Sequence, residues 1–320
     1  MIFRNAGVST ERVRFALRYE NSPNRGFKNT VFIMKNTLNM RREPRRGAKL
    51  AAGLRNENSS IHYLSILNGT TRGIVWTDSA ASPHIAVIYS CLLGGFQIMG
   101  APPQSAEDYA ALRLFFENTV FPQARDEFGL EEFAYSADTE ELSDMMRVVL
   151  FDKELFEQKQ LVYRTTAEIC ADGEPVFTEC GERIRIERAT ERLFRDNAEA
   201  ASVYLPEIAE SFKNLESFLK HGFAFFALDG ETVCGNLIAN GAYGGSYTVG
   251  ADTKTEYRRR GVASALLRAA VKFAQAQGDE IIWECAEENL PSVRTVEGCG
   301  LKRCGEFNVR WFEFDSENNE

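Results

Sequence analysis

One stretch of the chain constrains its fold more than any other, because a predicted strand enters an arginine-rich turn and then a helix. The strand covers 246–253, the helix covers 261–277, and three consecutive arginines lie between them at 258–260. The first turn of a helix has backbone N–H groups without intrahelical partners and carries the positive end of the helix dipole. Gly261 opens this helix and, lacking a Cβ, lets an anion approach the backbone. The stretch therefore predicts a pyrophosphate-binding turn that needs no metal, with an ordinary solvated basic turn as the alternative.

Apolar periodicity divides the rest of the chain into two α/β units of similar order. In the first unit it predicts strands at 73–78, 84–91, 131–138 and 159–166 and helices at 106–127 and 139–150. In the second it predicts strands at 184–187, 246–253, 280–286 and 304–314, a hairpin over 223–243, and helices within 190–220, 261–277 and 290–298. The recurring order suggests a degenerate tandem repeat, although no residue-level identity supports it.

Five segments follow from this pattern. They are a basic N-terminal segment (1–60), an N-terminal α/β domain (61–166), a linker (167–180), a C-terminal domain (181–314) and an acidic tail (315–320). The first segment carries 13 Lys and Arg against 4 Asp and Glu. A nucleic-acid arm and an organelle presequence are therefore open beside the simpler hypothesis of a poorly packed leader.

Charge and residue usage argue against several classes of function. The net charge of -9 disfavours nucleic acid as a partner and suits a cationic amine. Three histidines, and seven cysteines without a CxxC pair, offer no metal-ligand spacing, so we expect no metal. The longest apolar run, 85–99, is too short to span a membrane. We expect a cytoplasmic protein without a membrane partner and leave a homo-oligomer open.

The arginine turn and a second segment together resemble the GNAT superfamily of N-acetyltransferases. The pattern Arg258-x-x-Gly261-x-Ala263 has the spacing of the GNAT phosphate-binding loop, and residues 283–301 resemble the second GNAT signature. The resemblance implies an α/β (α+β) GNAT fold, with a central mixed twisted sheet flanked by helices, over 181–314. It implies a smaller, degenerate GNAT-like domain before it.

The whole chain also looks like the two-part subfamily that includes zwittermicin A resistance acetyltransferases. The similarity rests on the segment from Gly73 to Asp78, on Pro83 and on the triplet Trp283-Glu284-Cys285. The resemblance implies an N-acetyltransferase that uses acetyl-CoA as cosubstrate and a small-molecule primary amine as acceptor.

Carried over residue by residue, the resemblance assigns a cofactor site. Main-chain groups of 251–253 would line the acetyl and pantetheine arm, and residues 258–264 would hold the pyrophosphate. Asn289 and Ser292 would touch pantetheine. The predicted cofactor residues are Ala251, Thr253, Arg258, Arg259, Arg260, Gly261, Val262, Ala263, Ser264, Asn289 and Ser292.

Two carboxylates are the candidate catalytic residues. Direct attack in a ternary complex needs a neutral amine, and a positioned carboxylate can take its proton. Asp252 and Glu284 each fall near the carboxyl end of a predicted central strand. Strand alternation puts Glu284 on the face opposite Trp283 and Cys285. Partial burial beside Trp283 would raise its pKa toward neutrality.

The sequence departs from the family at the usual general acid. Many GNATs have a tyrosine seven residues after the asparagine, where this chain has Val296, and Thr255 replaces a common proline before the loop. The alternative function is therefore a non-catalytic acetyl-CoA-binding sensor or interaction module. We expect one cofactor site, because the first unit lacks the arginine pattern and has Glu107 and Asp108 where they would repel phosphate.

Overall fold

The computed structural model describes residues 38–43, 45–166, 176–177 and 183–314. The strands are β1 (Arg41–Arg42), β2 (Gly73–Thr77), β3 (Ile85–Ser90), β4 (Phe96–Gly100), β5 (Glu132–Ala137), β6 (Phe156–Arg164), β7 (Arg185–Arg188), β8 (Ala224–Asp229), β9 (Thr232–Tyr243), β10 (Ser246–Thr253), β11 (Glu280–Ala286) and β12 (Lys302–Glu313). The helices are α1 (Arg45–Ala51), α2 (Ile61–Asn68), α3 (Ala106–Phe115), α4 (Glu140–Val149), α5 (Glu191–Asp196), α6 (Ala198–Phe212), α7 (Leu215–His221), α8 (Val262–Gln275) and α9 (Leu290–Gly298).

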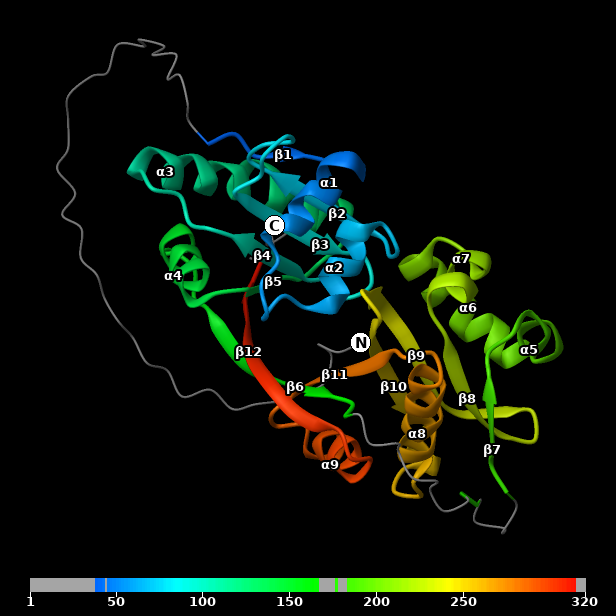
Figure 1. Ribbon diagram of the computed structural model, residues 1–320. Helices are drawn as coiled ribbons and strands as arrows, with labels where there is room; N and C mark the ends of the chain where they lie inside the picture. The colour runs from blue at the N-terminus through cyan, green and yellow to red at the C-terminus, as the bar shows by residue number, and fades with distance from the viewer. Residues whose placement is uncertain (1–37, 44, 167–175, 178–182, 315–320) are drawn as a thin grey trace, which may run out of the picture.

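Within the described chain, the strands form one mixed 12-stranded sheet, in the order β1-β2-β3-β4-β5-β12-β6-β11-β10-β9-β8-β7. In each half, an antiparallel series leads into one parallel pair, which is β4–β5 in the first half and β10–β11 in the second. The two halves then exchange their last strands. β12 pairs with β5, β6 pairs with β11, and β6 and β12 pair with each other (Figure 1). The sheet is therefore continuous across the junction between the halves.

Helices cover both faces of each half. In the C-terminal half, α8 and α9 pack on one face through a buried cluster that includes Leu266 and Val296. The helices α5, α6 and α7 cover the other face through Phe212 and Phe218. In the N-terminal half, α3 and α4 lie on one face and α1 and α2 on the other. The helix α2 also contacts β9 and β10, so it lies over the junction of the halves (Figure 1).

The structure confirms the predicted α/β class and adds helices that the sequence pattern does not predict. The elements β10, β11 and α9 have the predicted bounds. The unpredicted helices are α1 and α2; residues 62–67 of α2 are all buried, so the helix has no polar face to reveal its period. Because Ala48 and Ala51 of α1 are buried too, this part of the predicted leader is packed.

The division into five segments stays a prediction. Most of the linker 167–180 and all of the tail 315–320 lie outside the described residues. Among the described helices, none is both long and apolar enough to cross a membrane.

The early Gly73-to-Asp78 motif has a structural role at the start and end of β2. A Cβ at Gly73 would lie 2.3 Å from the Tyr89 carbonyl oxygen, so only glycine fits there. Asp78 accepts hydrogen bonds from the backbone N–H groups of His84, at 2.8 Å, and Ile85, at 3.1 Å. The motif thus fixes the β2–β3 connection, far from the arginine turn in the chain.

Candidate active site

The parallel strands β10 and β11 separate partway along their length. They pair from Ser246 to Thr248 with 280–282, whereas β10 continues to Thr253 and β11 to Ala286. On its other edge β10 stays paired with β9 as far as Thr253. Since backbone groups in a strand point alternately to its two edges, some N–H and C=O groups of 249–253 face this opening without a strand partner. The structure therefore has a gap between two parallel strands near the middle of the sheet.

Glu284 lies on the β11 wall of this gap. Its neighbours Trp283 and Cys285 belong to the buried cluster under α8, so Glu284 points to the opposite face, as predicted from alternation. Its carboxylate Oε1 accepts a hydrogen bond from Ser60 Oγ at 3.0 Å. The surrounding protein desolvates this partly buried side chain. Burial raises the pKa of Glu284 to about 7, and the Ser60 hydrogen bond offsets part of the rise.

The helix α2 supplies a second group beside this carboxylate. Tyr63 is buried, and its pKa is raised first by burial and then by the nearby charge of Glu284. It therefore stays a neutral phenol. Ser60 and Tyr63 both come from the N-terminal half, so the surroundings of Glu284 are built by both halves of the chain.

Asp252 lies on the β10 side of the gap and is exposed. It is opposite Asn236 of β9 in the sheet register, and Asn236 Nδ2 donates to Tyr204 Oη of α6 at 3.0 Å. Burial raises the pKa of Glu207, one turn along α6, and the charges of Glu210 and Asp252 add to that rise. Asp252 thus belongs to an acidic, solvent-facing edge rather than to the desolvated surroundings of Glu284.

Gly250 leaves room beside the polar side chain of Asn240 on this face. Its register partner on β9 is Ile238. Asn240, at the irregularity of β9, has its Nδ2 3.4 Å from where a Cβ at Gly250 would lie. Asn240 is only 9% exposed, and its Oδ1 has no hydrogen-bond partner among the described residues. A buried amide oxygen of this kind can accept a hydrogen bond from a bound donor. Sequence reasoning missed Asn240, because the β9 bulge that turns it to this face has no local signature.

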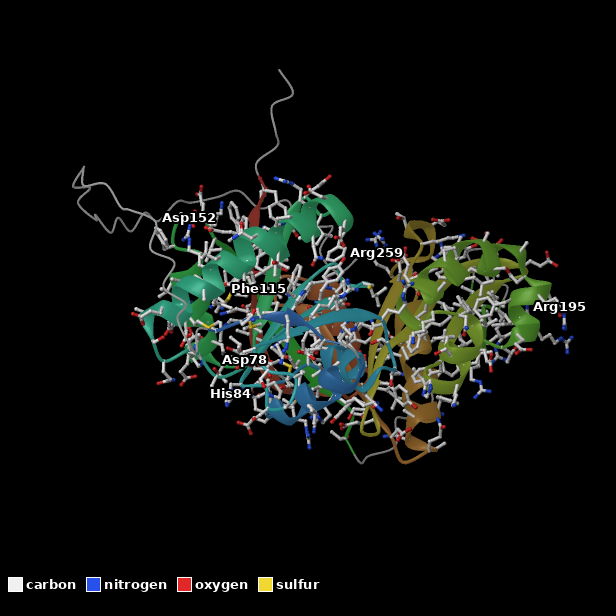
Figure 2. The ribbon with its side chains drawn as sticks, turned by 90° about the horizontal axis from the view of Figure 1, so that it is seen from above. Asp78, His84, Phe115, Asp152, Arg195 and Arg259 are labelled. Carbon is white, nitrogen blue, oxygen red and sulfur yellow. The ribbon has the colours of Figure 1, made fainter. Side chains whose placement is uncertain are left out.

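The arginine turn adopts the conformation that close anion contact requires. Gly261 is the N-cap of α8 with φ 84°, and it gives the helix no side-chain cap. Among the residues that the structure describes, only Val176 comes within 4 Å of where its Cβ would lie. Arg259 also has a positive φ, 61°, which is uncommon for a residue with a side chain. The first-turn N–H groups of α8, at 262–264, thus have no side-chain cap, and Arg258, Arg259 and Gly261 beside them are exposed (Figure 2 labels Arg259).

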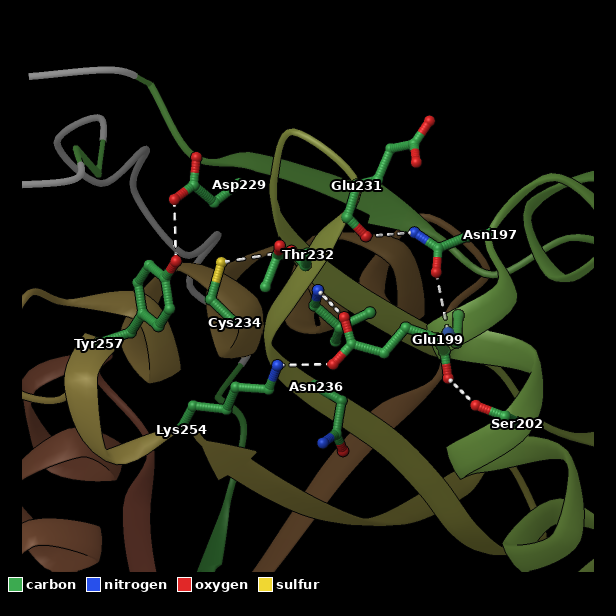
Figure 3. A network of polar contacts seen from close by, with 12 residues as sticks. Asn197, Glu199, Ser202, Asp229, Glu231, Thr232, Cys234, Asn236, Lys254 and Tyr257 are labelled. Carbon is green, nitrogen blue, oxygen red and sulfur yellow. Dashed lines mark hydrogen bonds and ion pairs between the residues drawn. The ribbon is translucent and has the colours of Figure 1, made fainter. Parts of the chain in front are cut away.

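A polar network anchors the approach to this turn (Figure 3). Lys254 Nζ forms an ion pair with Glu199 Oε1 of α6 at 2.5 Å, and Glu199 Oε2 accepts from Val233 N at 2.9 Å. Tyr257 Oη donates to Asp229 Oδ2 at 2.8 Å. Arg258 Nε donates to the Thr253 carbonyl at 3.0 Å. The segment between β10 and α8 is thereby held against the β8–β9 hairpin and α6.

Three other predicted cofactor residues, Thr253, Asn289 and Ser292, differ in their hydrogen bonding. Thr253 Oγ1 is buried beside Gly235 of β9 and has no hydrogen-bond partner among the described residues. Asn289 Oδ1 accepts from Ser292 N at 3.2 Å as the cap of α9, and Ser292 Oγ accepts from Trp283 Nε1 at 2.9 Å. Their role toward pantetheine stays a prediction. Val296 is fully buried in the core under α8, so α9 supplies no acid there.

The corresponding helix start in the N-terminal half is capped by Ser105, whose Oγ accepts from Asp108 N at 3.1 Å. Asp108 Oδ2 accepts from Ser105 Oγ at 2.8 Å, and its Oδ1 accepts from Leu38 N at 2.7 Å. Asp108 therefore adds negative charge to the first turn of α3, as does Glu107. The expectation of one cofactor site in the chain stays a prediction. Within the described residues, no group of three or more His, Cys, Asp or Glu could hold a metal ion.

A sequence model of the GNAT acetyltransferase family matches residues 52–309. A GCN5-related N-acetyltransferase-like protein from Streptococcus suis shares 15% identity and a TM-score of 0.58, over 83% of this chain and 98% of that one. A GCN5-related N-acetyltransferase from Sphaerobacter thermophilus shares 12% identity and a TM-score of 0.54, over 86% and 95% of the two chains.

A tandem GNAT protein from the clavulanic acid biosynthesis pathway is also similar. It shares 10% identity and a TM-score of 0.51, over 87% of this chain and 100% of that one. At these identities the structures show a common fold only. No curated protein is similar enough in sequence to count as a relative. The resemblance to zwittermicin A resistance proteins stays a prediction.

Proposed function

The chain belongs to the GNAT acetyltransferase family, and from this premise we propose that it is an N-acetyltransferase that moves an acetyl group from acetyl-CoA to a primary amine of a small molecule. The observation that carries the proposal is the position of Glu284. It lies on the wall of the β10–β11 gap, on the face opposite α8, with a pKa raised by burial to about 7. A carboxylate of this kind holds a proton well enough to take it from an amine near neutral pH.

The residues of the gap fit an elongated anionic cosubstrate. Exposed Gly261 and the positive φ of Arg259 lie at the start of α8, and at the end of β10 the Thr253 hydroxyl has no partner among the described residues. Residues 258–264 would hold the pyrophosphate, and main-chain groups of 251–253 would line the acyl arm. Acetyl-CoA supplies an activated acyl group when bound.

On the other face, Glu284 would act as general base. It would take the proton of the attacking amine, and the free N–H groups of 249–253 would stabilise the developing oxyanion. Asn240 Oδ1 would accept a second N–H of the amine, across the space that Gly250 leaves open. The departing thiolate would take its proton from solvent, because Val296 replaces the family's tyrosine.

Glu284→Gln tests this proposal directly. The variant keeps the shape and the acceptor of Glu284 but cannot accept the proton, so kcat/KM should fall about a hundredfold or more with acetyl-CoA affinity unchanged. The assay is thiol release from acetyl-CoA with a panel of amino acids, polyamines and amino-containing antibiotics. Binding of acetyl-CoA without turnover of any amine would favour a sensor instead. Turnover at the wild-type rate in Glu284→Gln would refute the base assignment.

A further inference from the structure

Ser60 connects Glu284 to the N-terminal half with a defined hydrogen-bond direction. Its Oγ accepts from His62 N at 3.3 Å, as the N-cap of α2. With its acceptor side used by the helix, the hydroxyl proton goes to Glu284 Oε1, 3.0 Å away. Ser60 is therefore a donor to the carboxylate and favours its charged form.

The preceding residue, Ser59, connects the same turn to a buried carboxylate within the N-terminal half. Ser59 Oγ donates to Asp138 Oδ2 in a short hydrogen bond and accepts from Asn56 N at 3.0 Å. Asn58 Nδ2 donates to the Asp138 carbonyl at 3.3 Å. Asp138 is 2% exposed and follows β5 directly. The turn before α2 is thus fixed to the end of β5.

Asp138 is itself held by a closed network. Gln97 Nε2 donates to Asp138 Oδ1, and Gln97 Oε1 accepts from Ser136 Oγ at 2.6 Å. All three side chains are buried. Burial raises the pKa of Asp138 to about 6, and the hydrogen bonds from Ser59 and Gln97 limit that rise. The network lies at the ends of β4 and β5, the N-terminal counterparts of β10 and β11.

We propose that Asp138 is a positioning residue for Glu284, acting through the consecutive hydroxyls of Ser59 and Ser60. The proposal rests on the proposed function of Glu284 as base. Asp138 fixes Ser59, Ser59 fixes the turn, and the turn holds the Ser60 hydroxyl on the carboxylate. The groups that face Glu284 from α2 are Ser60 and Tyr63, and β6 faces it with the apolar Val162. Asp138 is faced by Ser59, Asn58 and Gln97.

The test compares pH–rate profiles of Ser60→Ala, Ser59→Ala and Asp138→Asn with the wild type. Losing the Ser60 donor should raise the pKa that governs the acid limb, moving it about one pH unit upward. Ser59→Ala and Asp138→Asn should move it upward by a smaller amount, with KM for acetyl-CoA unchanged. Asp78→Asn, a substitution of another N-terminal carboxylate that contacts only the β2–β3 turn, should leave the limb in place (Figure 2).

The direction of the shift separates positioning from a charge effect. If Asp138 acted only through its charge, Asp138→Asn would lower the pKa that governs the acid limb. Ser59→Ala would then leave that pKa unchanged. That result, or no movement in either variant, would overturn the proposal. Glu284→Gln is measured beside them. Loss of the limb in Glu284→Gln with no shift in Ser59→Ala would refute the positioning alone, whereas an unchanged limb in Glu284→Gln would refute both proposals. If Asp138→Asn does not fold, the pH–rate profile of Ser59→Ala, which removes only one oxygen atom, decides whether the positioning proposal holds.

Discussion

At the scale of single residues, Glu284 is set by two opposing effects. Desolvation makes its charged form unfavourable, and the Ser60 hydroxyl partly restores it. The balance leaves a carboxylate that titrates near neutral pH. An ionised carboxylate in such a desolvated position lowers the stability of the folded protein. Residues that serve a reaction often lower stability in this way.

Glu284→Gln should therefore stabilise the protein at alkaline pH. The folded-state pKa of about 7 lies above the unfolded value near 4.3, so the folded chain binds more protons between these values. The stability that Glu284 contributes to the wild-type protein is therefore present at low pH and is lost as the pH rises through about 7. Glutamine has no charge to desolvate and keeps the acceptor for Ser60. Allowing for its partial exposure, we expect a gain on the order of 1–3 kcal/mol at pH 8 and none at pH 4.

Chemical unfolding of both proteins at the two pH values measures this difference. Glu288→Gln, on the exposed turn after the same strand, is the matched control and should not change the pH dependence. A Glu284→Gln protein that is less stable than the wild type at pH 8 would contradict the desolvation of Glu284.

At the scale of elements, the turn before α8 combines two left-handed residues with an open helix end. Gly261→Glu should abolish acetyl-CoA binding, because its carboxylate would occupy the anion site. Gly261→Ala should weaken binding more modestly, since a Cβ is strained at φ 84° although little lies near it. Calorimetric titration should give one site per wild-type chain, with the same affinity in a chelator.

Gly230→Ala is the control for this turn. Gly230 has φ 60° with nothing within 4 Å of a Cβ, so its substitution introduces similar strain at the tip of the β8–β9 hairpin. It should lower stability without changing affinity for acetyl-CoA. Equal affinity in Gly261→Glu and the wild type would locate the cofactor elsewhere, and loss of binding in chelator would show that a metal takes part.

The elements also show how far sequence reasoning reaches. Local periodicity and the Asp229-Gly230 turn predict the hairpin, β10, β11 and α9, and alternation predicts the face of Glu284, because each depends on neighbours in the chain. The helix α2 escapes prediction because it is buried on all sides. The sequence therefore also fails to predict that Ser60 and Tyr63 lie beside Glu284, which is more than 200 residues away along the chain. A serine before an apolar run was the available signal.

At the scale of the molecule, the exchange of β6 and β12 makes the two halves one structure. Phe312 of β12 is buried in the core of the N-terminal half, whereas Tyr163 of β6 is buried in the core of the C-terminal half. Each half would lose an interior strand if the chain were divided at the predicted linker. Pairing of strands so distant in sequence has no local pattern, so the sequence predicts two units but not their exchange.

The two halves should consequently unfold in a single transition. Trp76 lies in the N-terminal core and Trp283 in the C-terminal core, and Trp311 is the third tryptophan of the chain. Two variants, Trp283→Phe with Trp311→Phe, and Trp76→Phe with Trp311→Phe, each leave one reporter. Within each variant, fluorescence from the remaining tryptophan should change at the same denaturant concentration as the far-ultraviolet circular dichroism of the whole chain. Acetyl-CoA, bound in the C-terminal half, should raise the midpoint seen by Trp76 as much as that seen by Trp283. A Trp76 signal that precedes the dichroism change and ignores the ligand would show that the N-terminal half unfolds alone, despite the exchanged strands.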